Sequence, residues 1–586
     1  MSSTADLLDR LRRFVQDEAE AQYENLSRQW ARPIGERVAN GWAIEGLNVV
    51  REEKGIIRLV CDTNNSRFRE GDLLVLHQEK DSPKSSNALH VELQYDGETE
   101  IEVSLIKGNP YFLAAEPRGW IADQDWFDAS PFYLDALNTV ADSMRGRSTI
   151  LPLLSGALIP KMDYARYERA AQAAYEAGLN ESQVEAVAQS YAADLLHLIQ
   201  GPPGTGKTWV LAHLARLLVL DGQRVLITAL THRAIHNALN KFPRIDDSLH
   251  VCKIGEPRHT GDLNVTNFET FDQSHFGDLS GGYIVGATPF ALQSKRLAEV
   301  EFDVVLFDEA SQITLPLAIM GMLSANKYIF VGDENQLPPV TIFAQETEPE
   351  QAAQLSIFAF LAGRGDETML NVTYRLNDVL AEWPSRTFYR SELKPSEEAA
   401  GRRLQLSTNY SRWDFILDPQ YPAVFLDLCH RNTTVRSRTE AETTVELILA
   451  LLEHDIPPEE IGVVVPYRAQ SRLIRSLLRR QVNDEGVIGR LAVDTVERMQ
   501  GQEREVVLVS FTTSSPAFAL RMAGFLFQPQ RLNVSVTRPR TKLILIGSHQ
   551  MLAGSSQDPA LKEHFDLLRD LIDNCYTITL PEGHLT

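Results

Sequence analysis

The chain has 586 residues, a length that fits two to four domains. Of these residues 44% are hydrophobic and 23% charged, a composition that excludes a mainly disordered protein. Its 57 Lys and Arg residues against 79 Asp and Glu residues give a formal charge of −22. That charge excludes a protein that coats nucleic acid through a globally basic surface, so any polynucleotide track must be local.

The cysteines and the apolar runs limit the remaining classes. Cys61, Cys252, Cys429 and Cys575 lie far apart without CxxC spacing or a nearby histidine, so we expect no zinc site or iron–sulfur cluster. Scattered thiols fit a reducing compartment. The start lacks the apolar core of a signal peptide, and no run approaches the roughly 18 apolar residues of a membrane span. We therefore expect a cytoplasmic protein without a membrane association.

The first third of the chain alternates between two periodicities. Apolar residues at helical spacing predict an amphipathic helix over 4–30. From about 42 to 120 the period becomes two, and Asp96-Gly97 between alternating runs predicts a hairpin in a small antiparallel barrel. Helical patterning returns over 132–177 and ends at Gly178, a suitable C-cap. We therefore expect a stalk helix at 1–40, a β-barrel domain at 41–125 and stalk helices at 126–178.

The remainder predicts two α/β lobes. Apolar strand-like runs alternate with helices from 194 to 333, at LLHLIQ, RVLITAL, GYIVGAT, FDVVLFDEA and KYIFVGDE, which favours an open, mostly parallel sheet. The acidic stretch AQETEPEQAAQ looks like a solvated connector, and AVFLDLC, IGVVVPY, RLAVDTV, REVVLVSF and KLILIGS then repeat the alternation. We expect a first lobe at 179–343, a linker at 344–354 and a second lobe at 355–586.

A phosphate loop opens the first lobe. The sequence GPPGTGKT lies between a predicted strand and a predicted helix, which is the context that this motif requires. Its members are Gly201, Pro202, Pro203, Gly204, Thr205, Gly206, Lys207 and Thr208. Backbone N–H groups and the helix N-terminus would face the phosphates, Lys207 would neutralise the β and γ oxygens, and Thr208 would ligate Mg²⁺. The sequence therefore predicts an ATP site.

Polar residues at later strand ends complete this site. Asp308 and Glu309 follow an apolar strand, where open α/β sheets place their ligands. We expect Asp308 to hold Mg²⁺ through water and Glu309 to orient and deprotonate the attacking water. Gln336, before a stiff Leu-Pro-Pro turn, is a candidate for contacting the γ-phosphate. Gln183 offers one amide for the adenine edge, although a lone Gln on a helix is usually a surface residue.

The ordered set of motifs resembles a known family. GLNESQ, GPPGTGKT, FDEASQ, GDENQLPP, TYRLN, VVVPYRAQ, VDTVERMQGQE and RLNVSVTRPR follow one another between about 180 and 547. The set is similar to that of the superfamily 1 helicases, in the branch of the nonsense-mediated-decay and immunoglobulin-mu-binding-protein helicases. This resemblance implies two tandem RecA-like P-loop lobes, with a small N-terminal β-barrel held by a helical stalk.

The resemblance also implies roles for residues beyond the ATP-binding motifs. Arg375 and Arg538 look like arginine fingers, Tyr374 like the ring that stacks on adenine, and Glu503 like the acid that binds the ribose. The residues that match the family's nucleic-acid track are Thr231, Thr288, Pro466, Tyr467, Arg468 and Thr495. Most should meet phosphate and sugar, although Thr288 could instead cap a helix and Tyr467 could belong to the core.

The sequence departs from the family pattern at several positions. Thr231-His232 replaces the usual Ser-Asn, Thr373 replaces the Gln before Tyr-Arg, and Met499 stands where an aromatic residue is common. None of these departures removes a catalytic group. They leave open how tightly the chain binds a nucleic-acid strand.

Taken together, these features predict an ATP-hydrolysing helicase or translocase that moves on single-stranded DNA or RNA as a monomeric motor, 5′ to 3′ by the resemblance. The alternatives are a nucleotide-gated clamp without processive unwinding and, less well supported, a small-molecule kinase, which would leave both arginines and the second lobe unexplained. The barrel is either part of the motor or only a structural or docking module.

Overall fold

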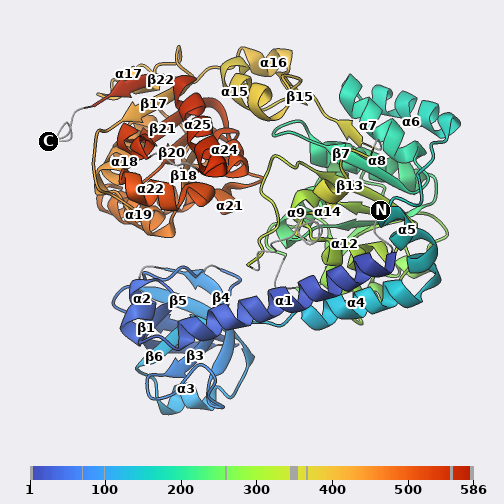
Figure 1. Ribbon diagram of the computed structural model, residues 1–586, viewed down its shortest axis with the longest axis horizontal. Helices are drawn as coiled ribbons and strands as arrows, with labels where there is room; N and C mark the ends of the chain where they lie inside the picture. The colour runs from blue at the N-terminus through green and yellow to red at the C-terminus, as the bar shows by residue number, and fades with distance from the viewer. Residues whose placement is uncertain are drawn as a thin grey trace. The chain divides into compact units, whose positions relative to one another are not determined.

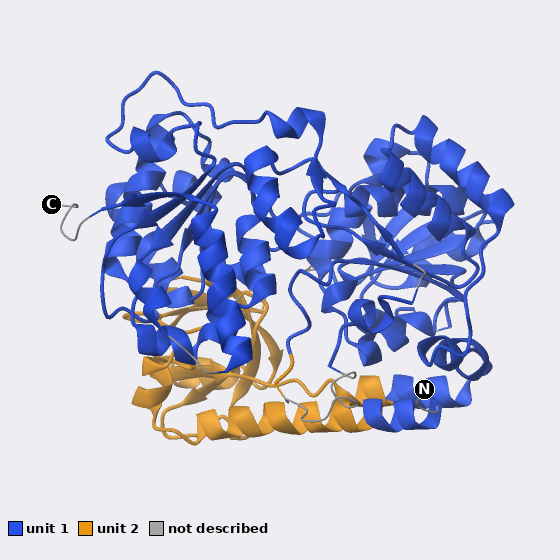
Figure 2. Ribbon diagram, turned by 45° about the horizontal axis from the view of Figure 1, so that its top comes forward, with its two compact units in different colours: residues 1–11, 135–340, 346–586 blue, residues 12–134, 341–345 orange. Residues whose placement is uncertain are grey.

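The computed structural model describes residues 4–53, 55–68, 70–97, 99–257, 260–297, 299–342, 354–364, 367–482, 484–554 and 558–580. These residues form two compact units (Figure 2). One unit lies within 1–11, 135–340 and 346–586, and the other within 12–134 and 341–345. Apart from Gln354, the predicted linker at 344–354 lies outside the described residues. In the described part of the chain, no helix has the length and apolar character needed to cross a membrane.

The smaller unit contains a closed antiparallel barrel with the strand order β1-β2-β5-β4-β3-β6. The strands are β1 (Ala43–Glu53), β2 (Ile56–Val60), β3 (Leu73–Gln78), β4 (Leu89–Asp96), β5 (Glu100–Lys107) and β6 (Trp120–Gln124). At the predicted hairpin turn, the Gly97 N–H donates to the Glu100 carbonyl at 2.9 Å. Inward-facing side chains such as Leu59, Leu93 and Val103 fill the barrel. The predicted small barrel is therefore confirmed.

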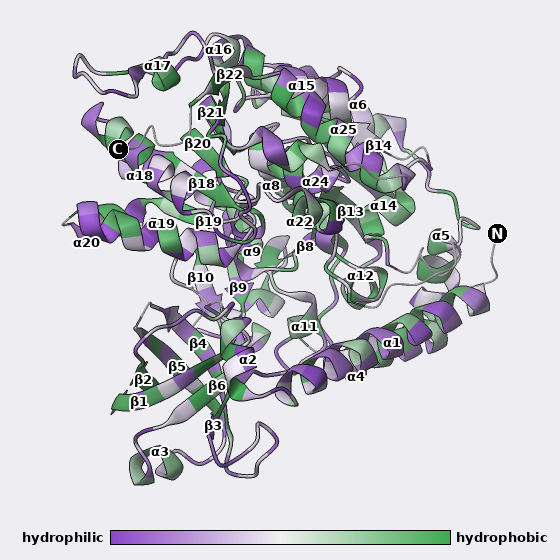
Figure 3. Cartoon of the chain, turned by 60° about the vertical axis from the view of Figure 1, so that its left-hand side comes forward, coloured by the Kyte–Doolittle hydropathy of each residue, from purple (hydrophilic) through white to green (hydrophobic). Residues whose placement is uncertain are grey.

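Helix α1 (Thr4–Trp30) forms where the apolar spacing predicts it, and hydrophilic and hydrophobic residues alternate along its length (Figure 3). Within the smaller unit, the Trp30 indole N–H donates to the Gln124 carbonyl at 3.1 Å. The Tyr23 and Trp126 rings pack with their centroids 5.2 Å apart. These contacts attach the C-terminal part of α1 to the end of β6. Two short helices, α2 (Ile34–Ala39) and α3 (Tyr111–Ala115), complete this unit.

Helices lead from the barrel to the first large sheet. They are α4 (Ser130–Asp142), the π-helix η1 (Gly146–Ile150), α5 (Leu151–Leu154), α6 (Tyr164–Glu176) and α7 (Glu181–Ala192). Gly178 follows α6 with a φ of 80°, a left-handed conformation in which glycine has no Cβ penalty. Its N–H donates to the Tyr175 carbonyl at 2.9 Å, as expected of a residue that ends a helix.

The first lobe contains a parallel sheet (Figure 1). Its strand order is β10-β9-β11-β8-β12-β13-β7-β14. Its strands are β7 (Leu196–Gln200), β8 (Arg224–Thr228), β9 (Val251–Ile254), β10 (Thr266–Phe268), β11 (Tyr283–Gly286), β12 (Val304–Phe307), β13 (Lys327–Gly332) and β14 (Glu367–Met369). Its helices are α8 (Lys207–Leu220), α9 (His232–Leu239), α10 (Phe242–Ile245), α11 (Pro289–Leu292), α12 (Leu315–Met322) and α14 (Ile357–Leu361), with 3₁₀ turns at η2 (Phe271–Ser274), η3 (Phe276–Asp278) and η4 (Ala310–Gln312). The five predicted strands are contiguous in this sheet.

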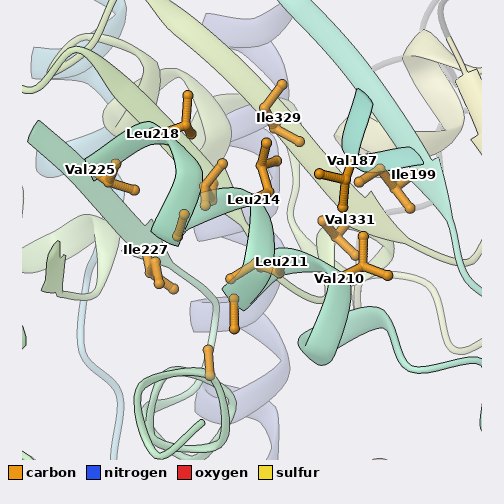
Figure 4. Close-up of a cluster of buried hydrophobic side chains, with 14 of the residues drawn as sticks. Val187, Ile199, Val210, Leu211, Leu214, Leu218, Val225, Ile227, Ile329 and Val331 are labelled. Carbon is orange, nitrogen blue, oxygen red and sulfur yellow. The ribbon is translucent and has the colours of Figure 1, made fainter. Parts of the chain in front are cut away.

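The core of the first lobe lies between this sheet and helices α7 and α8 (Figure 4). Buried side chains of α8, among them Leu211 and Leu214, pack on residues such as Ile227 and Ile329 of the central strands. Helix α8 therefore has a fixed position on the sheet, and its N-terminus lies at the carboxyl end of β7. This packing holds the phosphate loop in place.

The segment that follows the predicted linker belongs to the first sheet, which corrects its assignment to the second lobe. Strand β14 pairs in parallel with β7, with Thr368 opposite Ile199. The Arg364 guanidinium donates to the Leu154 carbonyl at 3.0 Å. The chain crosses to the second lobe only after Leu370. A three-residue strand carries almost no periodic signal, and its pairing with a strand far back in the chain leaves no local trace.

The second lobe contains a parallel sheet with the order β19-β18-β20-β21-β17-β22. Its strands are β17 (Ala423–Asp427), β18 (Ile461–Val465), β19 (Ala492–Thr495), β20 (Arg504–Ser510), β21 (Pro539–Gly547) and β22 (Tyr576–Thr579). Its helices are α15 (Asp378–Phe388), α16 (Glu397–Ala400), α17 (Asp414–Leu417), α18 (Arg438–Glu453), α19 (Arg468–Gln481), α20 (Glu485–Arg490), α21 (Val496–Met499), α22 (Pro516–Arg521), α23 (Ala523–Leu526), α24 (Pro529–Val536) and α25 (Pro559–Asp573), with 3₁₀ turns η5 (Pro458–Glu460) and η6 (His549–Ala553). A small ladder of β15 (Val372–Thr373) and β16 (Lys394–Pro395) precedes this sheet. The fold is thus two parallel α/β lobes of the RecA-like type with an N-terminal barrel, as predicted.

Candidate active site

The phosphate loop connects β7 to α8 and bends through two left-handed glycines. Gly204 and Gly206 have φ values of 76° and 83°, which L side chains rarely adopt. A Cβ on Gly206 would lie 2.8 Å from Nε2 of Gln183. The Gly201 N–H donates to the Gly332 carbonyl at 2.8 Å, and the Thr205 hydroxyl donates to the Pro202 carbonyl at 2.8 Å. The loop is therefore held in one curled conformation that presents N–H groups to an anion.

Lys207 and Thr208 form the first turn of α8. The Lys207 ammonium donates to the Gly201 carbonyl, and its charge partly offsets the effect of burial on the pKa values of Asp308 and Asp333. Thr208 is half-buried beside it. The structure thus places the predicted phosphate-binding lysine near two buried carboxylates.

The acidic pair follows β12 at the carboxyl edge of the sheet. The Asp308 N–H donates to the Thr228 carbonyl at 2.9 Å, which extends the β12–β8 pairing. Burial and the neighbouring Glu309 carboxylate raise the pKa of Asp308 above its usual range. Glu309 has a left-handed φ of 51°, a conformation that is uncommon outside glycine and gathers at functional sites. The two carboxylates meet different partners.

Glu309 contacts a residue of the second lobe that sequence analysis did not select. The Gln500 amide donates to Glu309 Oε2 at 3.3 Å across the lobes. Gln500 lies in the motif VDTVERMQGQE, so the motif was recognised but this residue was not assigned a role. A polar contact to the expected general base is suited to orienting it.

Gln336 lies in a buried hydrogen-bond path between the lobes. Its amide donates to Asp333 Oδ2 at 2.9 Å, and the Tyr389 hydroxyl donates to the same oxygen at 2.7 Å. The Asn533 amide in turn donates to the Tyr389 hydroxyl at 2.8 Å. Burial raises the pKa values of both Asp333 and Tyr389. Sequence analysis missed Asp333, Tyr389 and Asn533, because only their contacts distinguish them.

The two predicted arginine fingers lie side by side near Glu503. The Arg375 guanidinium donates to Glu503 Oε2 at 2.9 Å and to the Thr537 carbonyl at 3.0 Å. Arg538 is buried and donates to the Val534 and Gln502 carbonyls at 2.8 and 3.2 Å. Burial lowers the pKa of Arg538 to about 9, so it remains charged at neutral pH. Burial alone would raise the pKa of Glu503, but the charges of Arg375 and other guanidinium groups outweigh this effect, so the pKa is lowered.

The segment that carries Arg375 packs directly on the phosphate loop. The Tyr374 N–H donates to the Gly204 carbonyl at 2.8 Å, and the Thr373 hydroxyl donates to the Pro203 carbonyl at 2.9 Å. A Cβ on Gly204 would collide with Cβ of Arg375. Gly204 therefore allows this close approach. Nothing in the sequence indicates that Thr373 contacts the phosphate loop.

Tyr374 and Gln183 are joined by Asn180 at the start of α7. The Asn180 amide donates to the Tyr374 hydroxyl at 2.7 Å. The Gln183 carboxamide oxygen accepts from the Asn180 N–H at 3.1 Å, and its nitrogen donates to the Thr205 carbonyl at 3.0 Å. Gln183 is buried rather than a surface residue. The predicted adenine-binding residues therefore meet at one side of the phosphate loop.

The predicted nucleic-acid residues follow strands at the carboxyl edges of the two sheets. Thr231 and Thr288 follow β8 and β11, and each caps the next helix through its hydroxyl. Pro466, Tyr467 and Arg468 follow β18, and Thr495 ends β19. The Tyr467 ring is half-buried and lies with its centroid 5.8 Å from that of Phe525. Thr231 and Thr288 thus cap helices, and Tyr467 packs against the core of the second lobe.

No group of three or more His, Cys, Asp or Glu side chains that could hold a metal ion occurs in the part of the chain that the structure describes. The four cysteines, which all lie within the described residues, form no disulfide. The oxygen-rich pair of Thr208 and Asp308 remains the predicted position for Mg²⁺.

Comparison with known proteins finds family models and relatives that match most of the chain. Two family models described as AAA domains match residues 183–342 and 353–550. The Saccharomyces cerevisiae DNA replication ATP-dependent helicase/nuclease DNA2 is 30% identical over 67% of this chain and 27% of its own length. The Schizosaccharomyces pombe DNA polymerase alpha-associated DNA helicase A is 29% identical over 65% of each chain.

A third relative aligns over more of this chain. The Arabidopsis thaliana helicase/nuclease JHS1 is 26% identical over 84% of this chain and 38% of its own length. The chain thus spans well under half of the length of the helicase/nucleases that it matches. A solved arterivirus helicase, nonstructural protein 10 with DNA, covers 84% of this chain at 13% identity and a TM-score of 0.37, which is too low to indicate a shared fold.

Proposed function

The chain belongs to superfamily 1 of the helicases, in the branch of the Dna2-type and nonsense-mediated-decay helicases, and on this premise we propose that it is an ATP-hydrolysing motor that translocates on single-stranded nucleic acid. The observation that carries the proposal is the convergence of both lobes on one phosphate loop. Arg375 packs against Gly204, while Gln500 reaches Glu309 from the second lobe. A nucleotide bound at this loop would therefore contact groups from both lobes.

The residues around the loop have complementary roles in ATP hydrolysis. Gln183, Tyr374 and Glu503 would bind adenine and ribose, and the loop N–H groups with Lys207 would bind the phosphates. Thr208 and, through water, Asp308 offer the hard oxygen ligands that suit Mg²⁺, which would neutralise charge on the β and γ oxygens. Glu309 would accept a proton from the attacking water, with Gln500 orienting its carboxylate.

The arginines would stabilise the charge that develops on the transferred phosphoryl group. A planar guanidinium suits this task. Arg375 follows β15 and packs against Gly204 of the loop, and Arg538 lies between α24 and β21 of the second lobe. Their present partners include Glu503 and backbone carbonyls, so binding of ATP would exchange these contacts for phosphate contacts. Hydrolysis would reverse the exchange, and this cycle would drive lobe closure and opening.

We further propose that the strand crosses the carboxyl edges of both sheets, where Thr231, Thr288, Pro466, Tyr467, Arg468 and Thr495 lie. The relatives named as DNA helicases favour DNA as the strand, and the family resemblance favours 5′ to 3′ movement. Since one chain carries every group named here, the motor would act as a monomer. These contacts would reach the sugar-phosphate backbone and ignore sequence.

Steady-state ATPase activity tests this proposal at low salt, with single-stranded DNA, single-stranded RNA, duplex or no nucleic acid. We expect stimulation by a single strand, strongest with DNA, and loss of activity in Glu309→Gln and Lys207→Ala. A Glu309-dependent rate that no polynucleotide changes would contradict the motor. Stimulation without unwinding of a tailed duplex would instead favour a nucleotide-gated clamp.

A further inference from the structure

Residues 429–437 lie in the connection between β17 and α18 and carry basic side chains in an acidic protein. Arg431 and Arg436 are exposed, and neither forms an ion pair with any residue that the structure describes. Arg438, the next arginine, is paired with Glu442 at 2.7 Å. No acidic residue occurs between Asp427 and Glu440, whereas the whole chain has a charge of −22. The connection itself therefore carries a positive charge.

Hydrogen bonds to the segment that follows β20 hold this connection in one conformation. The Thr433 hydroxyl donates to the Thr512 carbonyl at 2.6 Å, and the Thr433 carbonyl accepts from the N–H groups of Ser514 and Ser515, each at 3.1 Å. The Thr512 hydroxyl donates back to the Thr434 carbonyl at 3.0 Å. These hydrogen bonds attach the connection to residues 512–515, which follow β20.

A buried carboxylate fixes the base of the connection. Glu440 is fully buried; its Oε1 lies 2.7 Å from His430 Nε2, and its Oε2 accepts from the Ser510 hydroxyl at 2.7 Å and the Thr512 N–H at 2.9 Å. Both oxygens thus have partners, as a buried carboxylate requires. Arg431 and Arg436 therefore lie in a segment that is held at its base by a buried carboxylate with hydrogen-bond partners for both oxygens.

The backbone of this region adopts unusual conformations. Cys429, Asn432 and Thr512 have left-handed φ values of 53°, 62° and 65°. Such conformations persist where surrounding contacts enforce them, and they gather at functional sites. Here they turn the chain so that Arg431 and Arg436 remain at the surface while Thr433 bonds inward.

The connection is also joined to the proposed strand track. The Ser437 N–H donates to Gln470 Oε1 at 2.9 Å, and the Gln470 amide donates to the Ser437 carbonyl at 3.0 Å. Gln470 lies two residues after Arg468 in the first turn of α19. This pair of bonds places residues 429–437 beside the track residues that follow β18.

We propose that residues 429–437 extend the nucleic-acid track of the second lobe, with Arg431 and Arg436 binding phosphates of the single strand. The inference rests on the proposed function and names further contacts for it. Guanidinium groups bind phosphate oxygens without reading bases, which suits a motor that moves along any sequence. The hydrogen bonds of Thr433 and Thr434 hold the backbone that carries both arginines in one conformation.

The test compares the Arg431→Ala/Arg436→Ala double variant with wild type and with Arg480→Ala. Arg480 is also exposed and forms no ion pair among the described residues, but it lies at the far end of α19, about 18 Å from Arg468 at the rise of a helix. Binding of a fluorescent oligothymidine is measured by anisotropy over a series of salt concentrations, and basal ATPase activity is measured in parallel. We expect the double variant to bind roughly ten-fold more weakly, with a salt dependence reduced by about 0.7 per lost phosphate contact. Basal ATPase activity should equal that of wild type.

Wild-type affinity and salt dependence in the double variant would overturn the assignment of the connection while leaving the proposed motor intact. Equal losses in Arg480→Ala would also overturn it, because the effect would then reflect general charge. Wild-type protein that binds no strand at all would overturn the proposed function and this inference together.

Discussion

At the scale of single residues, one hydroxyl joins the phosphate loop to the arginine segment. Thr373 is fully buried, donates to the Pro203 carbonyl and accepts from the Arg375 N–H at 3.3 Å. Thr373 therefore links the backbone of the phosphate loop to the backbone of the segment that carries Arg375, the predicted arginine finger.

Replacement of Thr373 by valine keeps the shape of the side chain and removes the hydroxyl. We expect kcat for ATP hydrolysis to fall roughly ten-fold, since loss of about 1.4 kcal/mol of positioning corresponds to that factor. Thr373→Ser is the matched control and should retain most of the activity. Steady-state kinetics with a thermal unfolding scan make the measurement. A valine variant that unfolds normally and keeps kcat would rule out the positioning role.

At the scale of elements, the start of α7 serves both the helix and the nucleotide site. The Asn180 carboxamide oxygen accepts from the Gln183 N–H at 3.0 Å as an N-cap, and its nitrogen donates to the Tyr374 hydroxyl. Gln183 completes a capping box, which satisfies two otherwise unpaired backbone donors. The same helix end therefore stabilises the lobe and positions the ring expected to stack on adenine.

Two substitutions at this position separate the roles. Asn180→Asp keeps the cap acceptor but loses the donor to Tyr374, so we expect near-normal stability with a raised KM for ATP. Asn180→Ala loses both, and we expect in addition a stability loss of about 1 kcal/mol. Chemical denaturation and ATPase kinetics on both variants provide the test. Identical KM values for the Asn180→Asp variant and the wild-type protein would contradict the link to Tyr374.

At the scale of the whole molecule, the larger unit depends on buried polar contacts between its two lobes. Asp333 belongs to the first lobe, whereas Tyr389 and Asn533 belong to the second. All three are buried, so their hydrogen bonds are protected from competition by water. They form a fixed connection near Gln336 while the arginines face the phosphate loop.

Tyr389→Phe should weaken this connection, because it leaves a buried Asp333 oxygen with one fewer donor. We expect the free energy of unfolding to fall by about 1–3 kcal/mol and the stimulation of ATPase activity by single strands to decrease. Denaturation curves and stimulated ATPase rates test both effects. Phe388→Leu, at the neighbouring position outside the hydrogen-bond path, serves as a control for packing changes. Unchanged stability and stimulation in Tyr389→Phe would show that the path does not couple the lobes.

Local sequence patterns predicted much of the fold and many of the candidate residues. The helix over 4–30, the hairpin turn at Asp96-Gly97 and the predicted strands of both lobes each follow from neighbouring residues, and the structure contains them. The phosphate loop was equally clear, because its glycines and Lys207 lie within eight consecutive positions. Periodicity and turn chemistry act over short stretches of chain, so they can be read without knowledge of the remaining structure.

Contacts between distant parts of the chain required the tertiary structure. Strand β14 joins the first sheet after the acidic stretch, and Gln500 meets Glu309 although 191 residues separate them. The Asp333–Tyr389–Asn533 path and the bonds of Thr373 likewise depend on how the lobes pack. Hydrogen bonds of this kind depend on the spatial positions of donor and acceptor, and nothing in the local pattern around either residue specifies its partner.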